Sequence, residues 1–213
     1  AWVKTNDGGD QIIAAFDRSE YWRLEVNGPS AGTGQVGMAL RLGNGSSTIV
    51  DFGGSTRVDD GQWHHVIGVF DNGEVRLYVD GQLDASTTVS ESVLGSGATR
   101  YGFIGVGSEA ASFDGGKTPT YFNGDLDEVA ILDTAITDQQ AADLYQLGAT
   151  GQLAGSHLNQ VQDRSPLGYW RLGESSTADP VADASGNGHE GVYHGGVNLG
   201  TTGALNADTD TAA

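Results

Sequence analysis

Apolar and polar residues alternate over short stretches in the first half of the chain, and turn-forming residues separate these stretches. Residues 22–26 place Trp, Leu and Val on one face of an extended chain and Arg and Glu on the other. This period-two pattern is typical of a half-buried strand. Residues 38–42 repeat it, and residues 62–70 form a longer run. The pattern therefore predicts that residues 1–110 fold as short β-strands.

Two dipeptides predict tight hairpin turns, because both central residues of such a turn have positive φ angles. They are Asn72-Gly73 and Asp80-Gly81, and the residues between them alternate apolar with polar side chains. Two hairpin turns around one strand predict a three-stranded antiparallel meander.

Two further strands and one helix are predicted in the middle of the chain. Residues 101–106 and 125–132 have strand composition, and a loop rich in Gly, Ser and Asp separates them. The helix is predicted over residues 137–147, because it opens with a Thr-x-x-Gln capping box and continues with apolar side chains at helical spacing. Gly148 is expected to end it.

The last third of the chain has a weaker pattern. Residues 149–166 are typical of a connector, with a short helical turn predicted at residues 158–162. Strands are predicted at residues 169–172 and 191–194. The small, polar tail from Gly200 onward is expected to be loose at its end.

Composition supports an all-β protein and excludes several classes of partner and site. Gly accounts for 34 of the 213 residues, which is typical of many turns. The sequence has ten Lys and Arg residues and 28 Asp and Glu residues, which give a net charge of -18. Binding to nucleic acid or to an anionic membrane is therefore not expected. No apolar run is long enough to span a bilayer. There is no Cys, which excludes disulfides and thiolate metal sites.

Four sequence segments resemble those of a known family and follow one another in the same order. Their order and spacing match the family over residues 1–148. The chain resembles the laminin-G-like family, whose fold is the concanavalin-A-like jelly roll, an antiparallel β-sandwich. This resemblance implies an extracellular or cell-surface module that binds glycans or proteins, for example in adhesion, without catalysis. The segments are residues 1–4, 61–81, 122–131 and the predicted helix.

The order of the segments departs from that of the family. Residues 169–174 and 183–191 resemble the opening strands of the family domain, which precede the strand matched here by residues 1–4. In this chain they come last. The chain is therefore expected to start inside one jelly roll, at a processed or excised edge at Ala1, and to stop inside the opening of another.

This order predicts a jelly roll over residues 1–148 without its opening strands, a linker over 149–166, and opening strands over 167–213. A sandwich without its first strands exposes unpaired backbone groups. The rear strands could close the sandwich of their own chain, as in a circular permutant. They could instead insert into a neighbouring copy and build a fibre. The chain could also be one period of a tandem-repeat surface protein.

A run of acids in the predicted strand 125–132 invites comparison with retaining β-glucanases, which share the jelly roll. Their pattern places acids at the first, third and fifth positions of the run, to act as a closely spaced pair. In this chain Asp125 and Asp127 occupy the first two of these positions, but the third is Val129. This departure argues against hydrolysis, and the chain is not expected to be an enzyme.

Carboxylates in loops suggest a calcium site, because Ca²⁺ prefers several oxygen ligands from acids, amides and backbone carbonyls. The resemblance places the loop around residues 183–190 near the strand that contains Asp127. The alternative is that these side chains cap turns and backbone groups. The candidate ligands are Asp127, Glu128, Asp183, Asn187 and Asp114.

Aromatic and histidine side chains provide the remaining candidates. Tyr101, Tyr121 and Tyr193 are predicted to form a sugar-stacking platform, with ordinary half-buried strand positions as the alternative. His64 and His65 are neighbours on a strand, so they face opposite ways and are not expected to share a metal.

Two functions follow as hypotheses from this sequence. The first is a binding module for a glycan or a surface protein. The second is a structural subunit of a fibre or repeat protein that binds copies of itself through donor strands, a reading based on the displaced opening strands.

Overall fold

The structure is a computed structural model, and it describes two five-stranded sheets that pack face to face as an antiparallel jelly-roll β-sandwich. The first sheet has the order β10 (Gly124–Asp127), β1 (Trp2–Thr5), β6 (His64–Asp71), β7 (Glu74–Val79) and β8 (Gln82–Thr88). The second has the order β5 (Ile49–Arg57), β4 (Gln35–Arg41), β3 (Trp22–Val26), β2 (Gln11–Phe16) and β9 (Gly102–Ile104). The fold class expected from the sequence is confirmed. The described residues are 1–16, 22–43, 49–95, 102–107, 116, 118–151, 154–206 and 208–213, with backbone alone for 154–156.

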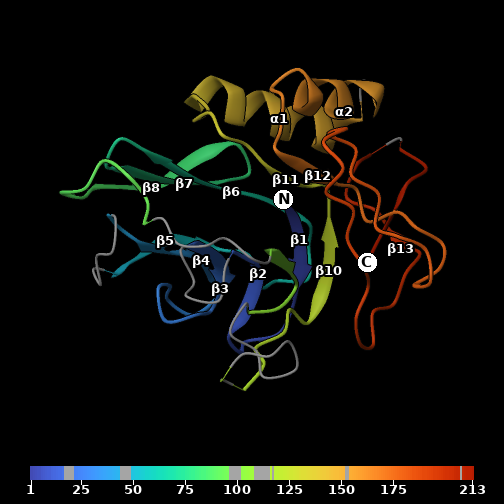
Figure 1. The fold of residues 1–213 in the computed structure, drawn as a ribbon, viewed down its shortest axis with the longest axis horizontal. Coiled ribbons are helices and arrows are strands. Elements are labelled where there is room, and N and C mark those ends of the chain that lie inside the picture. The colour runs from blue at the N-terminus through green and yellow to red at the C-terminus, as the bar shows by residue number, and fades with distance from the viewer. Residues whose placement is uncertain are drawn as a thin grey trace.

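Two small ribbons and two helices are the other regular elements of the described residues. β11 (Val129–Ile131) pairs with β12 (Gly168–Trp170), and β13 (Thr201–Thr202) pairs with β14 (Thr211–Ala212). Figure 1 shows α1 (Asp138–Thr150) and α2 (Ala154–Gln162) above the first sheet, with the rear part of the chain, in orange and red, along its β10 side. No helix among the residues described is long and apolar enough to cross a membrane.

The main core lies between the two sheets, where the alternating strands place their apolar faces. Leu24 and Val26 of β3 and Met38 and Leu40 of β4 are all buried in it, as the period-two pattern predicts. A second cluster lies between the first sheet and the helices. There Tyr78 of β7 packs with residues of α1 and α2.

Both predicted hairpin turns are present. Asn72 and Gly73 have φ angles of 49° and 92°, and Asp80 and Gly81 have φ angles of 51° and 74°. Consecutive positive φ angles match the right-handed twist of paired strands, which is why Asn-Gly and Asp-Gly suit these turns. The predicted β6-β7-β8 meander is therefore confirmed.

The predicted strand 125–132 is not continuous. Glu128 has a φ angle of 53°, which breaks the strand into β10 and β11 and changes the pairing partner from β1 to β12. A positive φ is uncommon for a residue with a side chain, so contacts with the surrounding structure must compensate for its cost. The compensating contacts are those of the buried Glu128 carboxylate, described below.

Helix α1 begins as predicted but ends later. Thr137 is the N-cap, and it exchanges both capping-box hydrogen bonds with Gln140. The helix passes Gly148 and ends at Thr150, with Gly151 as its left-handed cap. Gly148 lies inside the helix and packs against Trp2, whose Cζ2 atom would lie 2.4 Å from a Cβ at this position. Its role is close packing rather than termination.

The cap of α1 gives a direct test of local stability. Thr137→Ala removes the side-chain acceptor of the Gln140 N–H and is expected to lower the free energy of unfolding by about 1 kcal/mol. Urea denaturation measures this loss. Thr134→Ala is the matched control, because Thr134 bonds only the neighbouring exposed Asp133 side chain among the contacts described. An equal effect of the two substitutions would contradict the capping role.

The rear part of the chain differs from two expectations. Residues 191–194 do not form a strand, and Gly191 makes only an isolated bridge with Val181. The tail is not loose at its end: the Ala213 N–H donates to Leu126 O at 3.2 Å, and the Leu126 N–H donates to Ala213 O at 2.7 Å. These bonds attach the tail to the outer edge of β10, because that edge offers unpaired backbone groups.

Rear residues also pack on the front of the same chain. The β12 strand pairs with β11, and Leu205 is buried against Trp2. The Asn206 N–H donates to Gly148 O at 3.0 Å. In this single chain the rear segment therefore lies against its own front sandwich.

Candidate functional site

Asp127 and Glu128 lie at the junction between the front sandwich and the rear segment. Both are buried, with 1% and 3% of their surface exposed. Asp127 Oδ2 accepts a hydrogen bond of 2.8 Å from the Ala204 N–H. Glu128 accepts hydrogen bonds from the Tyr169 hydroxyl and, at 2.8 Å, from Arg171 Nε. These two acids join the rear segment to the sheet and do not line an open rim.

Arg171 is the main positive charge of this junction. Its Nη2 atom lies 2.7 Å from Asp208 Oδ2 and 3.0 Å from Asp210 Oδ2, in addition to its bond with Glu128. Burial alone would lower the pKa of Arg171, but the charges of Glu128, Asp210 and Asp208 raise it. One guanidinium therefore balances three carboxylates.

Among the described residues, no basic side chain is paired with Asp127. Burial raises its pKa to about 8, against the opposing effect of the Ala204 hydrogen bond, and the charges of Glu128 and Asp210 raise it further. Its Oδ1 atom is buried and has no hydrogen-bond partner among the described residues. A carboxyl group in this environment favours its protonated form.

The two adjacent histidines face opposite ways, as predicted. His64 Nδ1 lies 2.8 Å from Asp80 and its Nε2 lies 3.1 Å from Asp60, and the bond with Asp80 raises its pKa despite partial burial. His65 is buried with its ring 4.9 Å from that of Trp2. Burial lowers the pKa of His65 well below its usual value, so this ring is neutral.

Two other candidate metal ligands stabilise a turn in the rear segment. Asp183 accepts hydrogen bonds from the N–H groups of Tyr169, Ser185 and His189 at 2.9–3.0 Å. The Asn187 amide donates to the carbonyls of residues 166 and 167. Burial alone would raise the pKa of Asp183, but bonds from Ser185 and His189 lower it.

The candidate ligands do not assemble into a calcium site in the part of the chain that is described. No group of three or more His, Cys, Asp or Glu residues there is placed to hold a metal ion. Asp127 Oδ2 and both carboxylate oxygens of Glu128 and Asp183 already bond to protein groups. Asp114 lies outside the described residues. Calcium binding by the chain stays a prediction.

The three candidate tyrosines have different environments. Tyr101 lies outside the described residues. Tyr193 packs partly buried against the core, and its hydroxyl donates to Glu174 Oε2 at 2.6 Å. Tyr121 is 53% exposed, and it forms an isolated antiparallel β-bridge with Val106. Only Tyr121, of the two that are described, presents most of its side chain to solvent.

Tyr121 lies two residues before Asn123, which forms part of a polar group at one end of the sandwich. Asn123 Nδ2 donates to Asp7 Oδ2 at 2.6 Å, and the Gly9 N–H donates to Asp7 Oδ1 at 2.7 Å. These two bonds, that from Asn123 first, lower the pKa of Asp7, so it is an anion at neutral pH. We call Tyr121, Asn123 and Asp7 the rim site.

The rim site rests on a buried side chain. Gln11 is 1% exposed, its Oε1 accepts a 3.0 Å bond from the Asn123 N–H, and its Nε2 donates to Asp7 O at 2.9 Å. Thr5 Oγ1 donates to Asn123 O at 2.8 Å. The backbones of Asp7 and Asn123 are therefore held by one network. The sequence analysis did not identify these two residues, although Asp7-Gly-Gly9 is a turn signal.

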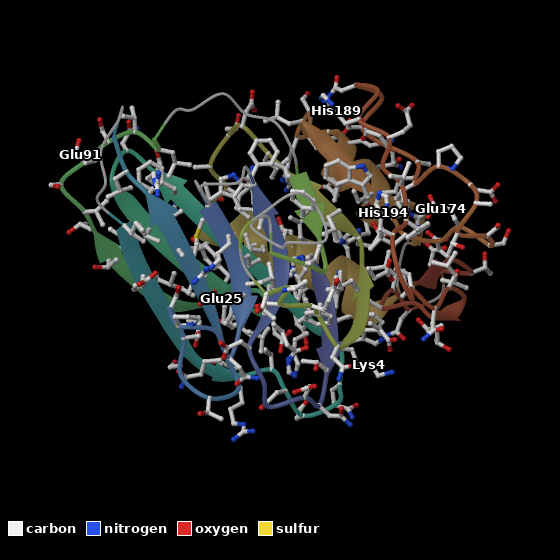
Figure 2. The ribbon with its side chains drawn as sticks, turned by 60° about the horizontal axis from the view of Figure 1, so that its bottom comes forward. Lys4, Glu25, Glu91, Glu174, His189 and His194 are labelled. Atoms are coloured by element: carbon white, nitrogen blue, oxygen red, sulfur yellow. The ribbon has the colours of Figure 1, made fainter. Side chains whose placement is uncertain are left out.

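Lys4 lies on the β1 strand that leads into this end of the sandwich. Its ammonium group is 3.3 Å from Asp125 and 5.8 Å from the centre of the Trp63 ring. Figure 2 shows Lys4 at this end of the sheet, apart from Glu174 and His194 on the rear segment.

A family model described as the concanavalin A-like lectin/glucanases superfamily, of the laminin G type, matches residues 1–142 of the 213. The chain belongs to this superfamily. No curated protein sequence matches this lectin/glucanase-like domain.

Three solved structures are similar to the domain at low sequence identity, and the first of them shares its fold. A candidate carbohydrate-binding protein from Bacteroides ovatus ATCC 8483 has a TM-score of 0.62 and 17% identity, over 88% of this chain and 48% of its own. The heptameric SAP-like pentraxin of Limulus polyphemus has a TM-score of 0.49 and 21% identity, over 68% and 66% of the two chains. Domains LG4-5 of the mouse laminin alpha1 chain have a TM-score of 0.37 and 20% identity, over 49% and 26%. The domain thus spans about half of the Bacteroides protein.

The acids that invited comparison with glucanases are not open to a substrate. Asp125 pairs with Lys4, while Asp127 and Glu128 are enclosed by residues of the rear segment. A retaining glycosidase needs two carboxyl groups facing the scissile bond. A binding surface is better sought at the rim site, which has an exposed aromatic residue two positions before the hydrogen-bonded Asn123.

Proposed function

We propose that this chain is a non-catalytic carbohydrate-binding module and that the rim site is its glycan-binding surface. The observation that carries the proposal is the exposed Tyr121, two residues before Asn123 of the hydrogen-bonded Asp7–Asn123 pair. An aromatic ring provides a flat apolar face with low conformational freedom, and a carboxylate with an amide offers acceptors and donors for sugar hydroxyls.

Preorganisation supports the same conclusion. Gln11 and Thr5 hold the backbones of Asp7 and Asn123, so a ligand need not order these two residues on binding. Binding sites gain affinity when such ordering costs are small. The superfamily and the Bacteroides neighbour are in keeping with this class of ligand, although the latter shares only the fold.

As part of this proposal, the module acts outside the cell or at the cell surface, in adhesion to a glycan-bearing partner. A net charge of -18 keeps the chain soluble and resists non-specific association with polyanions. Specificity in this fold resides in the loops at the ends of the sandwich.

The test compares two substitutions of one side chain on a glycan array, followed by titration of the best ligand. Tyr121→Ala is expected to weaken binding at least tenfold, about 1.4 kcal/mol, whereas Tyr121→Phe retains the ring and binds within about threefold of the wild type. Leu83→Ala, at a position 46% exposed on β8, is the control for loss of an exposed apolar side chain.

The outcomes separate the function from the site. Wild-type chain that binds no glycan would overturn the proposed function. Glycan binding that Tyr121→Ala leaves intact would remove the rim site from it. Repeating the titration with a chelator tests the calcium prediction, because loss of binding would require a metal site.

A further inference from the structure

Two loops and the end of β5 meet at the end of the sandwich that carries the rim site. Asn27 Nδ2 donates to Asp7 O at 3.0 Å, and the Gly34 N–H donates to Asn27 Oδ1. A Cβ at Gly34 would lie 2.8 Å from Arg57 Nε, which belongs to the last residue of β5. The charges carried by these segments therefore lie close to the rim site and contribute to its electrostatic field.

The positive charges at this end are already paired with acids of the same chain. Lys4 Nζ lies 3.3 Å from Asp125, and Arg57 Nη2 lies 2.7 Å from Asp59. His64, the first residue of β6, bonds two further carboxylates. Each of these cations therefore has an acid partner, and none of them is left to balance the charge of an acidic sugar.

Asp7 differs from these acids because neutral groups hold its charge in place. Its carboxylate accepts hydrogen bonds from the Asn123 amide at 2.6 Å and from the Gly9 N–H at 2.7 Å. These two bonds lower the pKa of Asp7, and no cation among the described residues contributes to that change. Asp10, on the same loop, is exposed and adds a second negative charge. The rim site therefore presents a fixed anion that the described part of the chain does not neutralise.

We propose that Asp7 is a specificity-determining residue of the rim site and that the glycan it selects carries a free amino sugar, whose ammonium group pairs with the Asp7 carboxylate. This inference rests on the proposed function, because it concerns the ligand of the same site. A carboxylate has roughly four acceptor positions. Asn123 and Gly9 occupy two of them, which leaves acceptor positions for a ligand. Hydrogen bonds between two ionised groups are stronger than those between neutral groups.

The same charge separates three classes of sugar. A uronate or a sulfate placed against Asp7 meets a like charge, and the net charge of -18 adds to this repulsion at low salt. N-acetylation replaces the ammonium group by a neutral amide, so the sugar ring can still contact Tyr121 but the ion pair is lost. The expected order of affinity is therefore free amino sugar first, neutral sugar second and acidic sugar last.

The test titrates the chain with tetrasaccharides of glucosamine, N-acetylglucosamine and glucuronic acid by calorimetry, at about pH 5.5, where an amino group is mostly protonated. Glucosamine is expected to bind at least fivefold more tightly than N-acetylglucosamine, and glucuronic acid more weakly than both. Raising the salt concentration should reduce the preference for glucosamine, because salt screens exposed charges. Tetralysine is the control ligand, since it carries four side-chain ammonium groups without sugar rings.

Two variants assign the preference to a residue. Asp7→Asn keeps the size of the side chain and removes its charge, so the preference for glucosamine should fall below twofold while N-acetylglucosamine binds within about threefold of the wild type. Asp10→Asn is the matched control, because it removes one charge from the same loop at an exposed position. It should leave most of the preference in place.

The outcomes distinguish this inference from the proposed function. A chain that binds N-acetylglucosamine through Tyr121 but shows no preference for glucosamine would retain the proposed function and lose the inference. An equal loss of preference in Asp7→Asn and Asp10→Asn, or binding of tetralysine as tight as that of glucosamine, would assign the attraction to the overall negative charge and also overturn it. Absence of binding to any glycan would overturn the proposed function itself.

Discussion

Arg171→Ala is expected to lower the free energy of unfolding by about 3–5 kcal/mol, because it leaves a fully buried carboxylate without its cation. The Glu128 side chain is 0% exposed and Arg171 Nε lies 2.8 Å from it. Asp208 and Asp210 lose the same partner, so three carboxylates would repel one another at the junction. We expect the rear segment to detach before the front sandwich unfolds.

Urea denaturation measures the loss, and limited proteolysis reports whether residues of the rear segment become accessible first. Lys4→Ala is the matched control: Lys4 lies 3.3 Å from Asp125, their side chains are 39% and 24% exposed, and such surface pairs contribute about 0–1 kcal/mol. Adding Glu128→Gln to Arg171→Ala should restore part of the stability by removing the unpaired charge. A loss no larger than that of Lys4→Ala would show that the junction does not depend on this ion pair.

Local signals predicted the elements whose geometry is set by a few neighbouring residues. The Asn72-Gly73 and Asp80-Gly81 turns and the Thr137 cap follow from backbone preferences that the sequence displays directly. The alternation in β3 and β4 predicted which side chains enter the core for the same reason.

Features that depend on distant segments could not be predicted in this way. The break at Glu128 is stabilised by Tyr169 and Arg171, more than 40 residues later, and nothing near Glu128 signals them. Gly148 has the appearance of a helix terminator, but the Trp2 ring that it contacts comes from β1.

The candidate sites show the same division. Asp127 and Glu128 were predicted as metal ligands at a rim, and the structure places them under the rear segment instead. In the rim site, Tyr121 was predicted from its residue type, whereas Asp7 was missed because its partner Asn123 lies 116 residues away. Residue chemistry suggested candidate groups, and the fold decided which of these groups meet.

The stability of the protein is expected to fall as the pH rises from about 4 to 8, because of Asp127. Burial raises the pKa of this carboxyl from 3.8 to about 8 in the folded chain. A raised folded-state pKa means that folding favours the protonated form, so its contribution is fully present below pH 4 and is lost as the pH rises through 8. Glu128 and Asp210 face the same group and their charges increase the effect, while Arg171 is engaged by both.

Asp127→Asn removes this titration and keeps an oxygen that accepts the Ala204 N–H. The variant should therefore be more stable than the wild type at pH 8, by several kcal/mol, since one unit of pKa shift corresponds to about 1.4 kcal/mol. At pH 4 the two chains should agree within about 1 kcal/mol, because Asp127 is then mostly neutral in the folded wild type. Urea denaturation at both values measures the difference. Asp125→Asn is the control, since Asp125 lies on the same strand beside the partly exposed Lys4 and should shift stability little at either pH. Parallel pH profiles for the wild type and Asp127→Asn would contradict this prediction. They would mean that Asp127 is ionised in the folded protein and that a cation or a water molecule contacts its Oδ1 atom, which has no hydrogen-bond partner among the described residues.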